Sequence, residues 1–166
     1  MMVQTTQPTF QYKRAIITFL LAYLAITVVA TGFSLLVGAL LVTSPVTEPL
    51  QDPGYILSEK FLPLLNLIVW TPFSLVYFKK RTNILGLRKE ALALGAFWLA
   101  MALPVDFLGF VVIQSPLSLS AYDFYIGQFP WIYLIYIAVF MSPFCGTAFV
   151  KVKTLSGTPK TNKATT

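Results

Sequence analysis

Residues 91–113 form an apolar stretch of 23 residues that contains a single charged side chain, Asp106. About 20 apolar residues in a helix cross the ~30 Å hydrocarbon core of a bilayer, so this stretch is long enough to span one. An ionisable group inside a span is costly in hydrocarbon and usually has a function. The stretch therefore predicts a transmembrane helix and makes Asp106 the first candidate for a functional residue.

Three other apolar stretches accompany it, at residues 15–42, 61–78 and 130–150. The first is too long for the apolar region of a cleaved signal peptide, so we expect it to be retained. The chain of 166 residues is 57% hydrophobic and 11% charged, whereas soluble domains carry about 25% charged residues. The sequence predicts an all-α integral membrane protein, a single bundle of four transmembrane helices within residues 1–150. Residues 151–166 are basic and predict a disordered cytoplasmic tail.

The connections between these stretches contain turn and cap signals. Residues 43–60 contain three prolines and are expected to form a loop. Ser120 and Asp123 have the spacing of a capping box, in which each side chain binds a free N–H group at a helix start. This pattern predicts a short interfacial helix around residues 121–126, before the fourth span, although a plain loop is the alternative.

The basic residues predict the orientation of the chain. If the four stretches span the membrane, eleven of the twelve Lys and Arg residues lie on one side, and Lys60 alone lies on the other. Positive residues favour the cytoplasmic side, so both termini are expected to be cytoplasmic. The net charge of +6 is then explained by contact with an anionic inner leaflet, and nucleic-acid binding becomes an unnecessary hypothesis.

Aromatic residues are concentrated near the ends of the predicted spans, as is typical of interfacial anchors. The expected anchors are Tyr55, Tyr125 and Trp131 at the outer face and Tyr77 at the inner face. A binding site for a ligand is the alternative function of the outer group.

Small residues repeat every four positions in the first span, which places them on one helix face. They are Ala22, Ala30, Ser34 and Gly38, with Ile26 in the same row, and the fourth span has Ser142 and Gly146. Helices in lipid associate through small residues that allow close approach. These rows are expected to be packing faces, and a homodimer contact is another use of the first one.

Counting from the outer ends of the spans places one polar group from each helix in a common layer. Asp106 lies roughly 10 Å, Asn66 roughly 8 Å and Ser34 roughly 12 Å below the outer surface, at 1.5 Å per residue. Thr31 is the alternative to Ser34 on its helix, and Tyr136 is the candidate from the fourth span. We therefore expect a polar cluster of these residues inside the membrane.

Three roles for Asp106 are open, because no Lys or Arg lies within a span to neutralise it. It is either protonated and hydrogen-bonded as a clasp that fixes the helices, or it is part of a proton- or cation-coupled transport site. A third possibility is a pocket for a lipid or small ligand, or a catalytic acid.

No known reaction motif is present in the sequence. The chain has no histidine and one cysteine, Cys145, so no metal, haem or other cofactor is expected. The sequence favours a non-enzymatic accessory or interaction protein of the cell membrane, most simply a bacterial cytoplasmic membrane, whose partners are the bilayer and a partner membrane protein or further copies of itself. The alternative is a small proton- or cation-coupled transporter or channel, using Asp106 in an oligomer.

Overall fold

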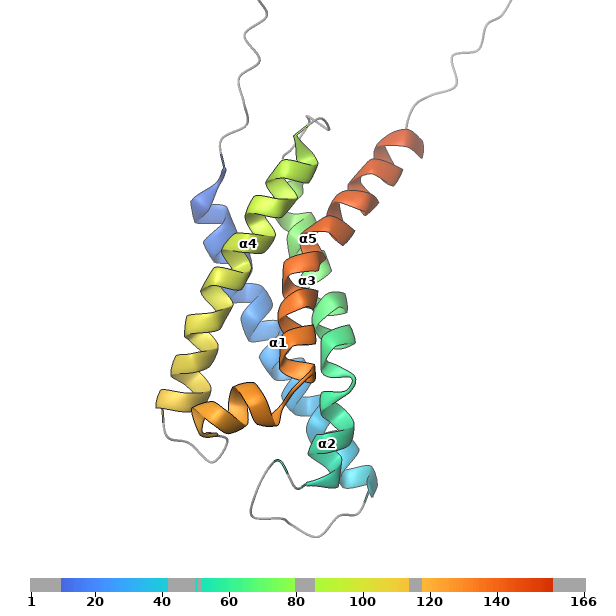
Figure 1. Cartoon of the computed structure of the whole chain (residues 1–166). Helices are drawn as coiled ribbons and strands as arrows, with labels where there is room; N and C mark the ends of the chain where they lie inside the picture. The colour runs from blue at the N-terminus through green and yellow to red at the C-terminus, as the bar shows by residue number, and fades with distance from the viewer. Residues whose placement is uncertain (1–9, 42–49, 51, 80–85, 114–117, 157–166) are drawn as a thin grey trace, which may run out of the picture.

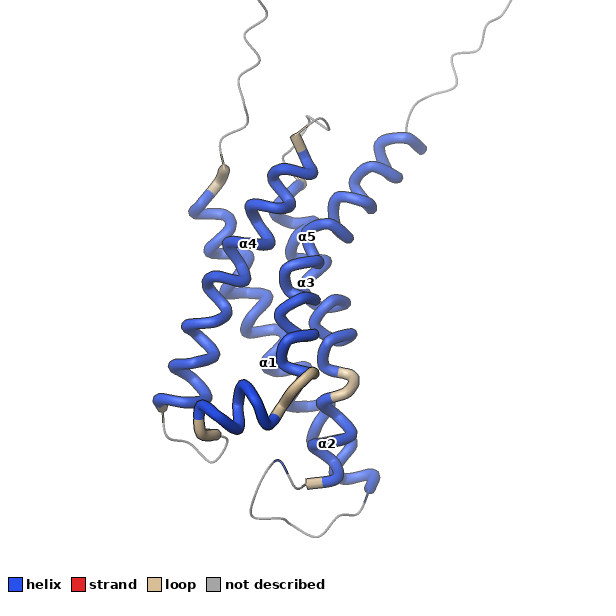
Figure 2. The backbone as a smooth tube through the Cα atoms, in the orientation of Figure 1, coloured by secondary structure: helices blue, strands red, loops and turns tan. Residues whose placement is uncertain are grey.

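The computed structural model describes residues 10–41, 50, 52–79, 86–113 and 118–156. Within these ranges the chain is helical apart from short connections, as predicted (Figure 2). The helices are α1 (Tyr12–Leu41), α2 (Pro53–Glu59), α3 (Leu62–Phe78), α4 (Leu87–Asp106), η2 (Phe107–Val112), η3 (Asp123–Gly127) and α5 (Trp131–Ser156). The segments η2 and η3 are π-helical, a wider helix with hydrogen bonds five residues apart.

The long helices run between two ends of an elongated bundle (Figure 1). One end, here called the terminal end, holds the starts of α1 and α4 and the ends of α3 and α5. The other, the loop end, holds α2 and the short η3 helix, which lies across the bundle. The chain therefore begins and ends its described helices on the same side.

Among the described residues, three helices are long and apolar enough to cross a membrane, namely Tyr12–Leu41, Leu87–Val112 and Trp131–Val150. A fourth candidate arises only if α2 and α3 are taken together, and these two helices are bent by 49° where they meet. The structure thus agrees with a helical membrane protein with at least three candidate spans.

Residues 53–59 form a helix, so the prediction of a loop throughout residues 43–60 was wrong there. The Asp52 carboxylate accepts a hydrogen bond from the Gly54 N–H group at 2.7 Å, and Pro53 occupies the first turn. An Asp cap followed by Pro is a helix start. The sequence interpretation treated Pro53 and Gly54 as breakers and missed this signal.

The other boundaries differ from expectation at helix ends. The third predicted span begins four residues earlier, at Leu87 rather than Ala91, and its last residues adopt the π-helical form of η2. Helix α5 continues to Ser156, into the segment expected to be a disordered tail, and residues 157–166 lie outside the described ranges.

The Ser120 half of the predicted capping box before the fourth span is confirmed, whereas the Asp123 carboxylate binds the Ser120 hydroxyl and not a backbone N–H group. The Asp123 N–H group donates to Ser120 Oγ at 3.0 Å, and Ser120 Oγ donates to the Asp123 carboxylate at 2.7 Å. Helical turns follow at residues 121–127, where a short helix was expected. The buried Phe124 ring stacks on Phe110 of η2, with ring centroids 5.6 Å apart, and this contact holds η3 against the bundle.

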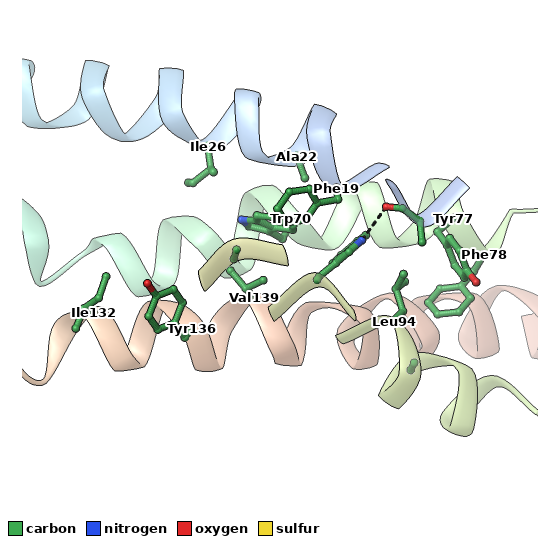
Figure 3. Packing of buried hydrophobic residues seen from close by; sticks show 14 of the residues in the cluster. Phe19, Ala22, Ile26, Trp70, Tyr77, Phe78, Leu94, Ile132, Tyr136 and Val139 are labelled. Carbon is green, nitrogen blue, oxygen red and sulfur yellow. Dashed lines mark hydrogen bonds between the residues drawn. The ribbon is translucent and has the colours of Figure 1, made fainter. Parts of the chain in front are cut away.

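A row of aromatic rings forms the centre of the bundle (Figure 3). Phe19 of α1 lies 5.5 Å from Trp70 of α3, and Trp70 lies 5.1 Å from Trp98 of α4, centroid to centroid. All three side chains are buried. The Trp98 indole also donates to the Ala15 carbonyl oxygen at 3.1 Å, so its polar edge joins α4 to α1.

Glycine residues bring the helices close at three points. A Cβ atom on Gly146 of α5 would lie 2.0 Å from Ser74 Oγ of α3, and one on Gly95 of α4 would lie 2.4 Å from the Phe140 carbonyl oxygen of α5. A Cβ atom on Gly54 of α2 would lie 2.8 Å from the Cα atom of Gly38 of α1. These positions exclude any larger side chain, as expected for helices that associate through close backbone contact.

The small-residue row of α1 is a packing face within the chain. Ala22 and Ile26 are buried, Ser34 Oγ donates to Ser58 Oγ at 3.0 Å, and Gly38 faces Gly54. The row therefore contacts the core with its first half and α2 with its second half.

Candidate functional site

Asp106 is the last residue of α4 and directly precedes the π-helical segment η2. Pro104 lies two residues before it inside the helix and has no N–H group to bond the preceding turn. A proline followed by π-helical turns widens the helix at this point. Such interruptions are rare in helices and are frequent at functional sites.

The Asp106 carboxylate binds a side chain from another helix. Tyr23 of α1 donates its hydroxyl proton to Asp106 Oδ1 at 2.5 Å. The bond joins residues 83 positions apart in the sequence and connects α1 to the end of α4.

Two further tyrosines complete what we call the Asp106 cluster, which consists of Asp106, Tyr23, Tyr136 and Tyr125. Tyr136 of α5 is 93% buried, and its hydroxyl lies beside both Asp106 and Tyr125. Within the described residues this hydroxyl makes no hydrogen bond of normal geometry, unlike that of Tyr23. The cluster thus combines one carboxylate with phenol groups from α1, α5 and η3.

An open groove of about 470 Å³ adjoins the cluster between α4 and α5. Tyr125 and Tyr136 belong both to the cluster and to the wall of the groove. The remaining lining residues are mostly apolar: Leu99, Leu103, Tyr133, Ile137 and Phe140. Chemically, the cluster joins α1 to α4 through the hydrogen bond between Tyr23 and Asp106 and places the Tyr136 hydroxyl of α5 beside it. A carboxyl group beside phenol groups can also accept or release a proton.

The other residues of the expected polar cluster bind elsewhere. Asn66 donates to the Leu62 carbonyl oxygen at 2.9 Å and accepts from the Trp70 indole at 3.1 Å, so both partners lie on its own helix. Ser34 bonds to Ser58, and Thr31 is exposed. Of the five expected residues, the structure brings together Asp106 and Tyr136 and adds Tyr23.

Tyr23 was not predicted, because the depth of the polar residues on α1 was counted from the end of its apolar stretch. Helix α1 has 30 residues and continues beyond the level of Asp106 to pack on α2. Ser34 is eleven residues after Tyr23, which is roughly 16 Å along a helix. A tyrosine in mid-span, away from either interface, was the available signal, because Tyr at such depth needs a polar partner.

The expected aromatic anchors occupy different environments. Tyr55, Tyr125 and Trp131 are half-buried at the loop end. Tyr77, expected as an inner anchor, is almost fully buried at 1% exposure. Its hydroxyl donates to Glu90 Oε1 at 2.9 Å and accepts from the Gln11 N–H group at 3.3 Å, so its described contacts are inside the protein.

Glu90 is a second buried carboxylate that the sequence interpretation did not single out. It lies in the first turn of α4, where a negative charge is favourable to the helix, and is 8% exposed. In the sequence, Glu90 follows two basic residues and precedes an apolar stretch, a pattern that is typical of the boundary of a membrane span. The bond to Tyr77 instead joins α4 to the end of α3 at the terminal end.

The sequence matches no known family model, and comparison with curated proteins and with solved structures gave no match.

Proposed function

We propose that this chain is a non-enzymatic, multi-pass membrane protein that acts as an accessory or interaction subunit, with Asp106 as a polar clasp between its helices. In this proposal the chain crosses a bacterial cytoplasmic membrane four times, and both termini are cytoplasmic. The α2–α3 pair is the bent second span.

The arrangement of the helix ends supports this topology. Helix α1 begins and α5 ends at the terminal end, which supports an even number of crossings (Figure 1). The basic residues Lys13, Arg14, Lys79, Arg88 and Lys89 lie in helix ends on that side. Lys60, at the end of α2, lies toward the loop end. This distribution follows the positive-inside rule.

The bond between Tyr23 and Asp106 is the observation that carries the proposed role of the carboxylate. It joins α1 to α4 directly, and the neighbouring Tyr136 adds α5 to the same point. A polar contact in hydrocarbon fixes the register of helices, because each partner is costly to leave unpaired. A clasp therefore accounts for a carboxylate at this position.

The face of α1 that points away from the other helices supports an interaction role. Its exposed apolar side chains include Leu20, Leu24, Val28, Leu35 and Leu36, each more than half exposed. Within the chain α1 packs with one face only, so lipid or the helix of a partner subunit covers the other.

The clasp is tested by Asp106→Asn and Asp106→Leu in the purified protein. Asn retains an oxygen that accepts the Tyr23 hydroxyl, so we expect thermal unfolding in detergent close to that of the unchanged protein. Leu leaves Tyr23 without its acceptor, and we expect a clearly lower Tm. If Asp106→Leu unfolds at the same temperature as the unchanged protein, the carboxylate is no clasp.

The groove beside Tyr136 favours a second candidate, a proton- or cation-coupled transporter that uses Asp106 in an oligomer. In proteoliposomes with an internal pH dye, such a protein would carry a proton flux that Asp106→Asn abolishes. The accessory role predicts the same background leak for both proteins. An Asp106-dependent flux would replace the first proposal with the second.

The topology has its own test. A reporter that is active only in the cytoplasm is fused after Thr166, and a second fusion places it after Pro49, between α1 and α2. We expect activity from the first fusion alone, and the opposite pattern would reverse the orientation.

A further inference from the structure

A groove of about 580 Å³ runs along α1 and the end of α3 at the terminal end of the bundle, on residues that the Asp106 cluster does not use. Nearly all of its surface is apolar, and its charged lining residues, Lys13 and Arg14 at the start of α1, are here called its polar part. Its apolar part is formed mainly by the next two turns of that helix and by Val76 of α3. The lining residues are Gln11, Tyr12, Lys13, Arg14, Ile17, Thr18, Leu21 and Val76.

Two adjacent cations, Lys13 and Arg14, define the polar part. Arg14 donates one N–H group to the Val76 carbonyl oxygen, which holds its guanidinium between α1 and α3. A guanidinium has five N–H donors, so others remain for a ligand. Across the described ranges, neither Lys13 nor Arg14 forms an ion pair with an Asp or Glu side chain. Their charge is complementary to a phosphate group, which Arg binds with paired donors.

The apolar part continues directly from these cations. Ile17 is three residues after Arg14 and Leu21 is four residues after Ile17, so the three side chains lie on one face of α1. Ile17 is 47% exposed and Leu21 is 51% exposed within the chain. From Arg14 to Leu21 the face extends roughly 10 Å along the helix, enough for the upper part of an acyl chain.

From this combination we propose that the groove binds one anionic phospholipid of the cytoplasmic leaflet. Lys13 and Arg14 bind its phosphate, and Ile17, Leu21 and Val76 contact its acyl chain. The leaflet assignment rests on the topology proposed above, whereas the binding of the lipid itself does not. A free phosphate ion would use only the polar part of the groove.

The experiment measures retained lipid by native mass spectrometry of the full chain, released from nanodiscs of phosphatidylcholine that contain phosphatidylglycerol. The variant Lys13→Gln/Arg14→Gln removes both groove cations. The matched control Arg88→Gln/Lys89→Gln removes the same charge at the same end, from exposed positions in the first turn of α4 that do not line the groove.

We expect one phosphatidylglycerol on the unchanged protein and on the control, and no preferential retention of phosphatidylcholine. With the groove variant we expect affinity for phosphatidylglycerol to fall at least roughly tenfold relative to the control, since the phosphate loses charge-assisted hydrogen bonds to Lys13 and Arg14, each of which contributes about tenfold. An equal loss in both variants would mean general attraction to the anionic surface and would overturn the proposal. Equal retention of the two lipids would also overturn it.

Two further measurements keep the test decisive. Leu21→Trp fills the apolar part while keeping both cations, and we expect it to weaken binding of phosphatidylglycerol, even if the double variant folds poorly by circular dichroism. Inorganic phosphate or glycerol phosphate, added at the lipid concentration, should leave the bound lipid in place. Displacement by either would identify a simple anion site. A reversed topology in the reporter assay would change the leaflet and leave these results as they are.

Discussion

The contact between Gly146 and Ser74 allows a quantitative test of how closely α3 and α5 pack. In Gly146→Ala the new Cβ atom would lie 2.0 Å from Ser74 Oγ, where ordinary contact begins at 3.4 Å. The helices must therefore separate by about an ångström or the Ser74 hydroxyl must rotate. Rotation gives up its bonds to the carbonyl oxygens of Thr71, at 2.7 Å, and Ser142, at 3.3 Å.

Either response is costly. Overpacking a well-packed core costs about 1–3 kcal/mol, and hydrogen bonds between membrane helices contribute about 0.6 kcal/mol on average. We expect Gly146→Ala to lower the free energy of unfolding by about 2–3 kcal/mol. Ser74→Ala removes the colliding Oγ atom. In a protein that already carries Ser74→Ala, Gly146→Ala should therefore cost much less, because the nearest remaining side-chain atom at position 74 is Cβ, at 3.2 Å.

The assay is equilibrium unfolding in mixed detergent micelles for the two single variants and the double variant. This double-mutant cycle should give a coupling free energy of about 1–2 kcal/mol between Gly146→Ala and Ser74→Ala, because the two changes share one contact. Gly32→Ala is the control, since no atom lies within 4 Å of its Cβ position. If Gly146→Ala is as stable as Gly32→Ala, the close approach of α3 and α5 is refuted.

Three further predictions use the same unfolding assay. Tyr23→Phe removes the hydroxyl that donates to Asp106 and should lower the free energy of unfolding by about 1 kcal/mol or somewhat more. Tyr133 is an exposed tyrosine of α5, so the control Tyr133→Phe should have no measurable effect. Equal effects of the two substitutions would contradict the clasp. Gly95→Ala should cost about 2–3 kcal/mol, because its Cβ meets a backbone carbonyl of Phe140 that has no rotamer to escape to; a neutral result would exclude the close contact of α4 and α5. Tyr77→Phe should cost about 1–3 kcal/mol, because Glu90 loses this donor and the Gln11 N–H group loses its acceptor; an unchanged Tm would show that these bonds are unimportant.

The sequence predicted the helices well because their signals are local. Each apolar stretch contains a helix, and the Ser120 half of the capping box was found from spacing alone. The small-residue row of α1 also predicted a packing face, because spacing of four residues defines one side of a helix. The partner of each row was not predictable, since it depends on how the helices are arranged in space.

The polar contacts were harder to predict because they depend on tilt and on helix length beyond the apolar stretch. Counting residues from an assumed surface paired Asp106 with Ser34, whereas α1 extends past that level and presents Tyr23. Asn66 was assigned to the same cluster, yet its bonds are local to α3. A polar side chain in a span can satisfy itself within its own helix, and sequence position does not distinguish that case from a contact between helices.

Over its first half, helix α1 is joined to α4 by contacts that differ in kind from those of α5. Helix α5 meets α3 at Gly146 and α4 at Gly95, where backbone and side-chain atoms are already at contact distance. Over its first half α1 is joined to α4 by two hydrogen bonds, from Tyr23 to Asp106 and from the Trp98 indole to the Ala15 carbonyl oxygen, and only one of its faces is packed. A hydrogen bond can be exchanged for a bond to another donor, whereas a close backbone contact is lost only when the helices separate. The contact between α1 and α4 is therefore expected to respond more readily than those of α5 to a change at Asp106 or to a partner on the apolar face of α1. Any coupling between the Asp106 cluster and an interaction surface of this protein is expected to run through Tyr23.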